Sequence, residues 1–183
     1  MSKDYIAEHI GWLDSILTHP ENPHLFQDDH LAVIQKELAN RWIDENRLEL
    51  LNDLADRFGE EDVLAVIDQI ISTNCRRDWE LVGKEKGNSF AQFLKILWEP
   101  LRESGFEYSY ETEGNKTTFC VTKCAMYDLA RKIGAEKWLY HLVCLTDEPS
   151  IVGFNNKIEF RRTRTLMQGY PDCDHCYTDL SYK

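Results

Sequence analysis

The sequence predicts an α+β fold, in which a helical N-terminal region is followed by an antiparallel β-sheet with helices packed on one face. Two observations predict it. Apolar residues recur at helical spacing through about the first hundred residues, whereas beyond that point they alternate with polar residues, as in half-buried strands. We therefore expect a helical region over residues 1–104 and an α+β region over residues 105–183, packed together as one compact unit.

Helical spacing predicts four helices in the first region. The first is an apolar stripe that ends before Pro20. The second is expected to be one long helix, because its apolar positions continue to Phe58 and Gly59 follows in the usual C-terminal position. Gly83 and Gly87 are expected to bracket a loop, and Pro100 to kink or shorten the last helix. The expected helices cover residues 5–17, 28–58, 63–75 and 89–101.

The second region mixes strands with short helices. Phe106, Tyr108 and Tyr110 alternate with polar residues, and the turn at Glu113–Asn115 leads into a returning strand, which predicts a β-hairpin. Gly134 is expected to end the helix that follows. The expected elements are hairpin strands 106–110 and 117–121, helices 124–133 and 136–145, and strands 157–166 and 174–180.

Composition and charge restrict the kind of partner. The formal net charge of −11 argues against binding to nucleic acid or to an anionic membrane surface, both of which need clustered Lys and Arg. No apolar leader segment or membrane span is expected, so we expect a cytoplasmic protein whose six Cys are free thiols or metal ligands. We expect a small-molecule substrate or ligand as the partner. The exposure of Trp12 and Trp42 on the helical region is ambiguous, which allows a homodimer.

Cys124 and Cys144 are candidate catalytic thiols. Cys124 lies where a strand passes into a helix, and free N–H groups of a first helical turn favour a thiolate, so a lowered pKa is expected. Asp147 follows Cys144 by three residues and shares a helix face with it; as a general base it would need a pKa raised by burial. The simpler alternatives are a small buried Cys at a helix start and an Asp that caps a loop.

Arginines and two further cysteines supply candidate binding groups. On a strand, Arg162 and Arg164 share one face, where either would bind a substrate carboxylate through a two-pronged hydrogen bond, or would pair with surface Glu. Cys173 and Cys176 form a C-x2-C pair that, with Cys120 and Cys124, is the alternative zinc site. Strand alternation argues against this zinc site, so we expect the protein to have no cofactor. His175 is expected to be a solvated residue of the turn or strand.

Short islands of the C-terminal region resemble the L-2-amino-thiazoline-4-carboxylic acid hydrolase-like family. They are Thr122–Ala125, Gly134, Cys144–Asp147, Phe160–Leu166, and Gly169 with Cys173. The resemblance implies a hydrolase that opens the C–N bond system of a cyclic amidine-like acid. The positions that it implies for the site are Cys124, Cys144, Asp147, Arg162, Thr165 and Cys173. The family often has Pro after the first of these Cys, where this chain has Ala125.

The stretch from Gly169 to Cys173 is also similar to vinyl-reductase-4 type domains, which bind small molecules. The sensor versions hold zinc through Cys and Glu, but two matching positions here are Arg162 and Thr165, which are not usual zinc ligands. The sequence therefore leaves three hypotheses. They are a C–N hydrolase with no cofactor, a non-catalytic module that binds a small molecule, and a structural protein whose fold is stabilised by a bound metal ion.

Overall fold

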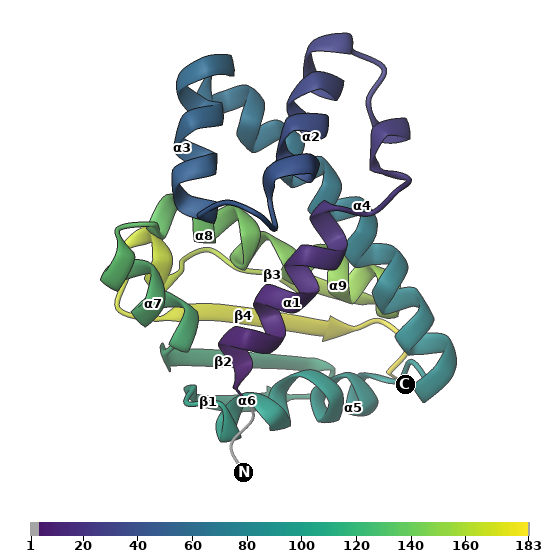
Figure 1. Ribbon diagram of the computed structural model, residues 1–183. Coiled ribbons are helices and arrows are strands. Elements are labelled where there is room, and N and C mark those ends of the chain that lie inside the picture. The colour runs from purple at the N-terminus through teal and green to yellow at the C-terminus, as the bar shows by residue number, and fades with distance from the viewer. Residues whose placement is uncertain (1–3, 183) are drawn as a thin grey trace.

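The computed structural model describes residues 4–182. Helices precede and accompany a four-stranded antiparallel sheet, which confirms the α+β class (Figure 1). The strands pair in the order β1-β2-β4-β3, so the last strand of the chain lies in the middle of the sheet. Their bounds are β1 (Glu107–Glu113), β2 (Lys116–Lys123), β3 (Ile158–Arg161) and β4 (Cys173–Asp179).

Side chains of Asp28, Asn46 and Ser89 accept hydrogen bonds from the first free N–H groups of the helices that follow them. No helix within residues 4–182 is both long and apolar enough to cross a membrane. The helices are α1 (Tyr5–Leu17), α2 (Asp29–Arg41), α3 (Arg47–Phe58), α4 (Glu60–Lys86), α5 (Phe90–Phe93), α6 (Glu99–Glu103), α7 (Ala125–Ile133), α8 (Glu136–Leu142) and α9 (Asp147–Phe154). A π-helical turn, Leu94–Trp98, joins α5 to α6.

The structure corrects several expected boundaries. The single helix expected over residues 28–58 is two, because the side chain of Asn46 accepts hydrogen bonds from the Leu48 and Glu49 N–H groups and starts α3 afresh. Gly83 lies inside α4 instead of in a loop. Expected helix 136–145 ends at Leu142, and a turn leads into α9, which the sequence pattern did not predict. Expected strand 157–166 ends at Arg161.

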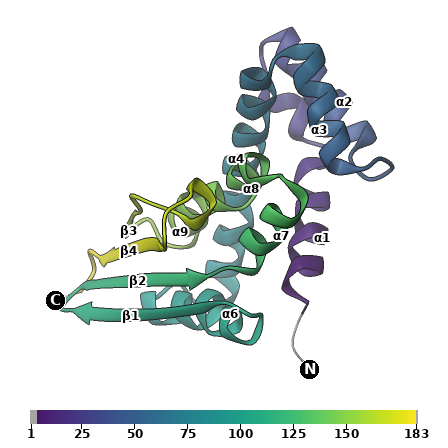
Figure 2. The ribbon, with the colours of Figure 1, turned by 90° about the vertical axis from the view of Figure 1, so that its left-hand side faces the viewer.

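The buried side chains form two hydrophobic clusters. The first lies among α1–α4 and includes Trp138 and Leu142 of α8. The second lies between the inner face of the sheet, α9 and the segment from α5 to α6. Helix α4 contributes to both and runs along the whole molecule (Figure 2). Trp42 belongs to the first cluster and is 1 % exposed, so it does not offer the outward face that a dimer contact would use.

Helices α4 and α9 approach each other closely through two glycines. A Cβ atom placed on Gly153 would overlap the backbone of Arg76, and one placed on Gly83 would lie 2.8 Å from the carbonyl oxygen of Phe154. Any larger side chain at Gly153 would push α9 away from α4. Since α9 begins at Asp147, this contact also fixes where the Asp147 side chain lies.

We expect Gly153→Ala to destabilise the protein by about 1–3 kcal/mol, because the added methyl group meets backbone atoms that cannot rotate away. Equilibrium unfolding in urea measures the change. The matched control is Gly11→Ala in α1, where a Cβ has no neighbour within 4 Å and alanine favours the helix. Equal stability of the two variants would contradict the close contact.

Candidate active site

A cavity of about 290 Å³ lies between the inner face of the sheet, α9, α1 and the end of the α5–α6 segment. This volume is at the small end of the range for ligand pockets, about 300–1,000 Å³. Its wall is mostly apolar and aromatic, with a few polar groups. The lining residues are Tyr5, His9, Trp12, Trp79, Leu97, Trp98, Leu101, Phe106, Val121, Cys124, Val143, Cys144, Thr146, Asp147, Ser150, Arg162, Cys173 and His175.

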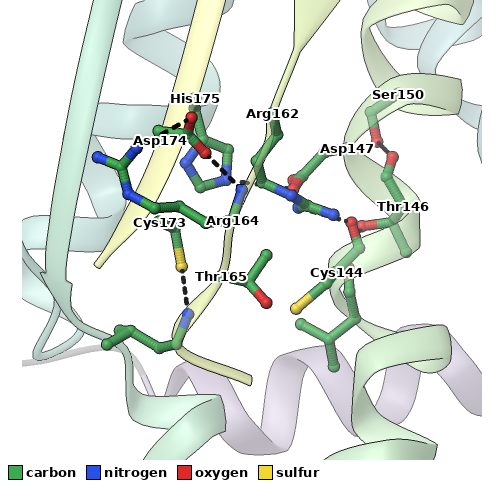
Figure 3. Close-up of polar contacts among 12 residues, drawn as sticks. Cys144, Thr146, Asp147, Ser150, Arg162, Arg164, Thr165, Cys173, Asp174 and His175 are labelled. Carbon is green, nitrogen blue, oxygen red and sulfur yellow. Dashed lines mark hydrogen bonds and ion pairs between the residues drawn. The ribbon is translucent and has the colours of Figure 1, made fainter. Parts of the chain in front are cut away.

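Asp147 is the central polar group of the cavity. It is the first residue of α9, where the helix dipole favours a negative charge. Its Oδ2 atom forms an ion pair with Nη1 of Arg162 and lies 3.2 Å from Nε2 of His175 (Figure 3). Nη1 of Arg162 also donates to the Cys144 carbonyl oxygen at 3.0 Å. Asp147 and Arg162 are therefore held by partners from three segments of the chain.

The two arginines of the expected strand point in different directions. The chain leaves the sheet after Arg161, and the Asp174 carboxylate accepts hydrogen bonds from the N–H groups of Thr163 and Arg164, each at 2.8 Å. Arg162 then reaches into the cavity, whereas Arg164 points away from it and pairs with Asp172 and Asp174 (Figure 3). The expectation that Arg162 and Arg164 share a face is therefore wrong.

The charge of Asp147 differs from the expectation for a general base. Burial alone raises the pKa of this carboxyl group, but the charges of His175 and Arg162 and the hydrogen bond from His175 outweigh burial. The pKa of Asp147 therefore lies below its ordinary value, and the group is a carboxylate at neutral pH. A carboxylate with a lowered pKa is a weak base and is better suited to orienting Arg162 and His175.

His175 is buried instead of solvated, which corrects a further expectation. Alternation along β4 places it on the inner face with Cys173 and Tyr177, and it is 8 % exposed. Because the Asp147 carboxylate only accepts hydrogen bonds, Nε2 of His175 carries the proton in this contact. Nδ1 is the second ring nitrogen, and this buried atom has no partner among residues 4–182.

Three thiols line the cavity: Cys124, Cys144 and Cys173. Burial raises the pKa of Cys124 to about 12 and outweighs the backbone N–H groups at the start of α7, which lower it. Burial likewise raises the pKa of Cys144 and of Cys173. The expectation of a lowered pKa for Cys124 is wrong, because the cost of burying a charge exceeds the effect of the helix terminus. All three groups are thiols at neutral pH.

The structure separates the other predicted site residues from the cavity. Cys120 and Cys176 lie on the outer face of the sheet, since their neighbours Phe119, His175 and Tyr177 face inward. The alternative zinc set of Cys120, Cys124, Cys173 and Cys176 is thus divided between two faces. Within the described residues no group of three or more His, Cys, Asp or Glu side chains is placed to hold a metal ion.

Thr165 and Arg164 have structural partners instead of a place in the cavity. Thr165 is 1 % exposed, and its Oγ1 atom accepts a hydrogen bond from the Gln168 N–H group at 3.1 Å, which caps a short helical turn. Of the four residues predicted to bind substrate, only Arg162 and Cys173 line the cavity.

Helix α1 supplies cavity residues that the sequence analysis did not place in the site. Tyr5, His9 and Trp12 project from one face of α1 into the lining. Burial lowers the pKa of His9 to about 4, although a backbone contact with Leu142 and the charge of Asp147 act in the opposite direction. His9 is therefore neutral at neutral pH. The spacing of these three side chains, four and then three residues, was the available signal.

The buried neutral His9 predicts a loss of stability in acid. An ordinary His, as in the unfolded chain, titrates near pH 6.5, and His9 in the folded protein near pH 4, so only the unfolded state takes up this proton between those values. This contribution is complete above pH 6.5 and disappears as the pH falls towards 4, a loss of about 3 kcal/mol.

Urea unfolding at pH 7 and pH 4.5 measures this loss. We expect His9→Gln to lose less stability than the wild type over that interval, and His24→Gln, at an exposed position, to behave like the wild type. A wild-type pH dependence that survives in His9→Gln would contradict the assignment to His9.

A family model matches most of the chain. A family model described as L-2-amino-thiazoline-4-carboxylic acid hydrolase matches residues 40–177, which is well over half of the chain. The matched range contains Asp147, Arg162, His175 and the three cavity thiols, but α1 precedes it. No curated protein matches the chain. The chain belongs to the L-2-amino-thiazoline-4-carboxylic acid hydrolase family.

Proposed function

We propose that the protein is a hydrolase that opens the ring of a small cyclic amidine-like acid, such as L-2-amino-thiazoline-4-carboxylate. The observation that carries the proposal is the convergence of Arg162, Asp147 and His175 on one small aromatic cavity. Family membership supports the choice of substrate class. The proposed reaction consumes only water and involves no change of oxidation state.

The cavity has the chemistry to hold such a substrate. A small flat ring suits a wall made of aromatic side chains. The hydrogen bonds that Arg162 donates to described residues all leave from Nη1, so its Nε and Nη2 groups are available to bind a substrate carboxylate through two parallel bonds. The proposal therefore assigns Arg162 as the anchor for the carboxylate.

His175 is assigned as the group that moves the proton. Its Nδ1 atom accepts a proton from a water molecule while the water oxygen adds to the amidine carbon. His175 passes this proton to the ring nitrogen. The ring C–N bond then breaks as the added hydroxyl group becomes a carbonyl, and the hydroxyl proton also moves to the departing nitrogen, which leaves as an amine. One water is consumed and one C–N bond is cleaved. Asp147 holds the imidazole and stabilises the imidazolium that forms during the transfer.

Water, instead of a cysteine, is assigned as the nucleophile. A thiol attacks as its thiolate, and burial keeps Cys124 and Cys144 protonated. In the proposal these two side chains contact the bound ring from the wall of the cavity. This assignment differs from the nucleophilic role expected from the sequence.

A non-catalytic module that binds the same class of small acid is the second candidate. The protonated state of all three cavity thiols favours it, because a binding cavity needs no reactive group. Incubation of the protein with L-2-amino-thiazoline-4-carboxylate separates the two. Hydrolysis yields the ring-opened product, whereas a binding module raises the melting temperature and releases the acid unchanged.

We expect Asp147→Asn and His175→Gln each to lower kcat by about 10²–10⁴-fold, because each removes a part of the proton-transfer pair. Steady-state turnover of L-2-amino-thiazoline-4-carboxylate measures the loss. Removal of the Asp147 charge also leaves Arg162 buried without its partner, so circular dichroism checks that each variant is folded. His175→Gln, which keeps that ion pair, is the variant to rely on where Asp147→Asn unfolds.

Cys124→Ser and Cys144→Ser are the contrasting variants. With water as the nucleophile, we expect each to keep kcat within about tenfold of the wild type, since only packing changes. A loss in either variant as large as that in His175→Gln would show that the thiol attacks, and would overturn the assignment of water.

We expect Arg162→Gln to raise KM for the acid by about 10–100-fold, because it removes a charged hydrogen bond to the carboxylate. The matched control is Arg164→Gln, which alters the neighbouring arginine on the side away from the cavity and should leave KM unchanged. An equal effect of both substitutions would contradict the role of Arg162 as the anchor.

A further inference from the structure

The cavity is completed by a helix that lies outside the region matched by the family. Tyr5, His9 and Trp12 of α1 line the cavity, and α1 precedes residues 40–177. The helix lies beside α7, which begins directly after Cys124 (Figure 2). Part of the cavity wall therefore comes from a helix that precedes the matched range.

Aromatic contacts fix the position of the His9 ring. The Tyr5 ring packs edge-on against Phe106, with ring centroids 5.0 Å apart, and stacks on His9 at 5.8 Å. The Trp12 ring lies 5.2 Å from the His9 ring. The imidazole thus contacts two aromatic rings that fix its position, as a group that recognises a ligand must be fixed.

Unpartnered polar atoms gather around this cavity. Nε2 of His9 and Nδ1 of His175 are buried and form no hydrogen bond of normal geometry with the described residues, although the His9 ring lies against the Leu142 backbone. Buried polar groups are nearly always paired, and each one left unpaired costs about 1–3 kcal/mol. Two such atoms on residues that line one cavity point to a polar ligand as their missing partner.

We propose that α1 completes the ligand site and that the His9 imidazole hydrogen-bonds the amidine edge of the bound substrate, an inference that rests on the proposed function. Arg162 would hold the carboxylate, which leaves the N–H groups of the amidine for an acceptor elsewhere in the lining. The unprotonated ring nitrogen of a neutral His9 is such an acceptor. A neutral ring also avoids the repulsion that an imidazolium would exert on a protonated amidine.

The test compares His9→Phe with His9→Gln. Phenylalanine keeps a flat ring but has no nitrogen, whereas the glutamine amide places a polar group near the position of Nε2. With L-2-amino-thiazoline-4-carboxylate as the probe, we expect His9→Phe to raise KM and the Kd from calorimetry by about tenfold or more. We expect His9→Gln to recover most of this loss, and Glu8→Gln, on the exposed side of α1, to match the wild type.

The outcomes distinguish this inference from the proposed hydrolase function. Normal turnover with an unchanged KM in His9→Phe overturns the role of His9 and leaves the hydrolase proposal standing. Binding of the probe without turnover overturns the hydrolase proposal, and the Kd of His9→Phe then decides the role of His9. Failure of the wild type to bind the probe at millimolar concentration overturns both.

Discussion

The requirement that a buried carboxylate be paired organises this molecule. An unpaired charge in an apolar cavity costs several kcal/mol, so Asp147 needs Arg162 and His175, which follow it by 15 and 28 residues. Satisfying this one group joins the start of α9, the chain that leaves β3 and the inner face of β4. The same three side chains form the polar end of the cavity. Stability and the proposed chemistry therefore depend on a single cluster.

Much of the fold followed from the sequence because the controlling signals are local. The helix that begins after Cys124 ends at Gly134 as predicted, and the hairpin turns at Gly114, since glycine in a left-handed conformation is itself a turn signal. Helix α9 lacked such a signal. It is buried on nearly all sides and contains Pro149 and Gly153, so its residues show no stripe of helical period.

The sequence predicted several of the residues that form the site, but it did not predict their pKa values. The family resemblance pointed to Asp147 and Arg162, and both reach the cavity. Strand alternation would also have placed His175 beside Cys173, but a His is usually solvated, and that general tendency outweighed the pattern. The pKa of Cys124 depends on how deeply the whole fold buries it, and no local sequence feature reports that depth.

The thiols that line the cavity also have a consequence for the durability of the protein. Peroxides and alkylating agents react with thiolates, and a thiol whose pKa is raised to about 12, as in Cys124, is almost never ionised at neutral pH. A cavity with three cysteines would otherwise be a weak point under oxidative stress. The raised pKa values keep these side chains in the less reactive protonated form, in which sulfur is a polarisable contact surface.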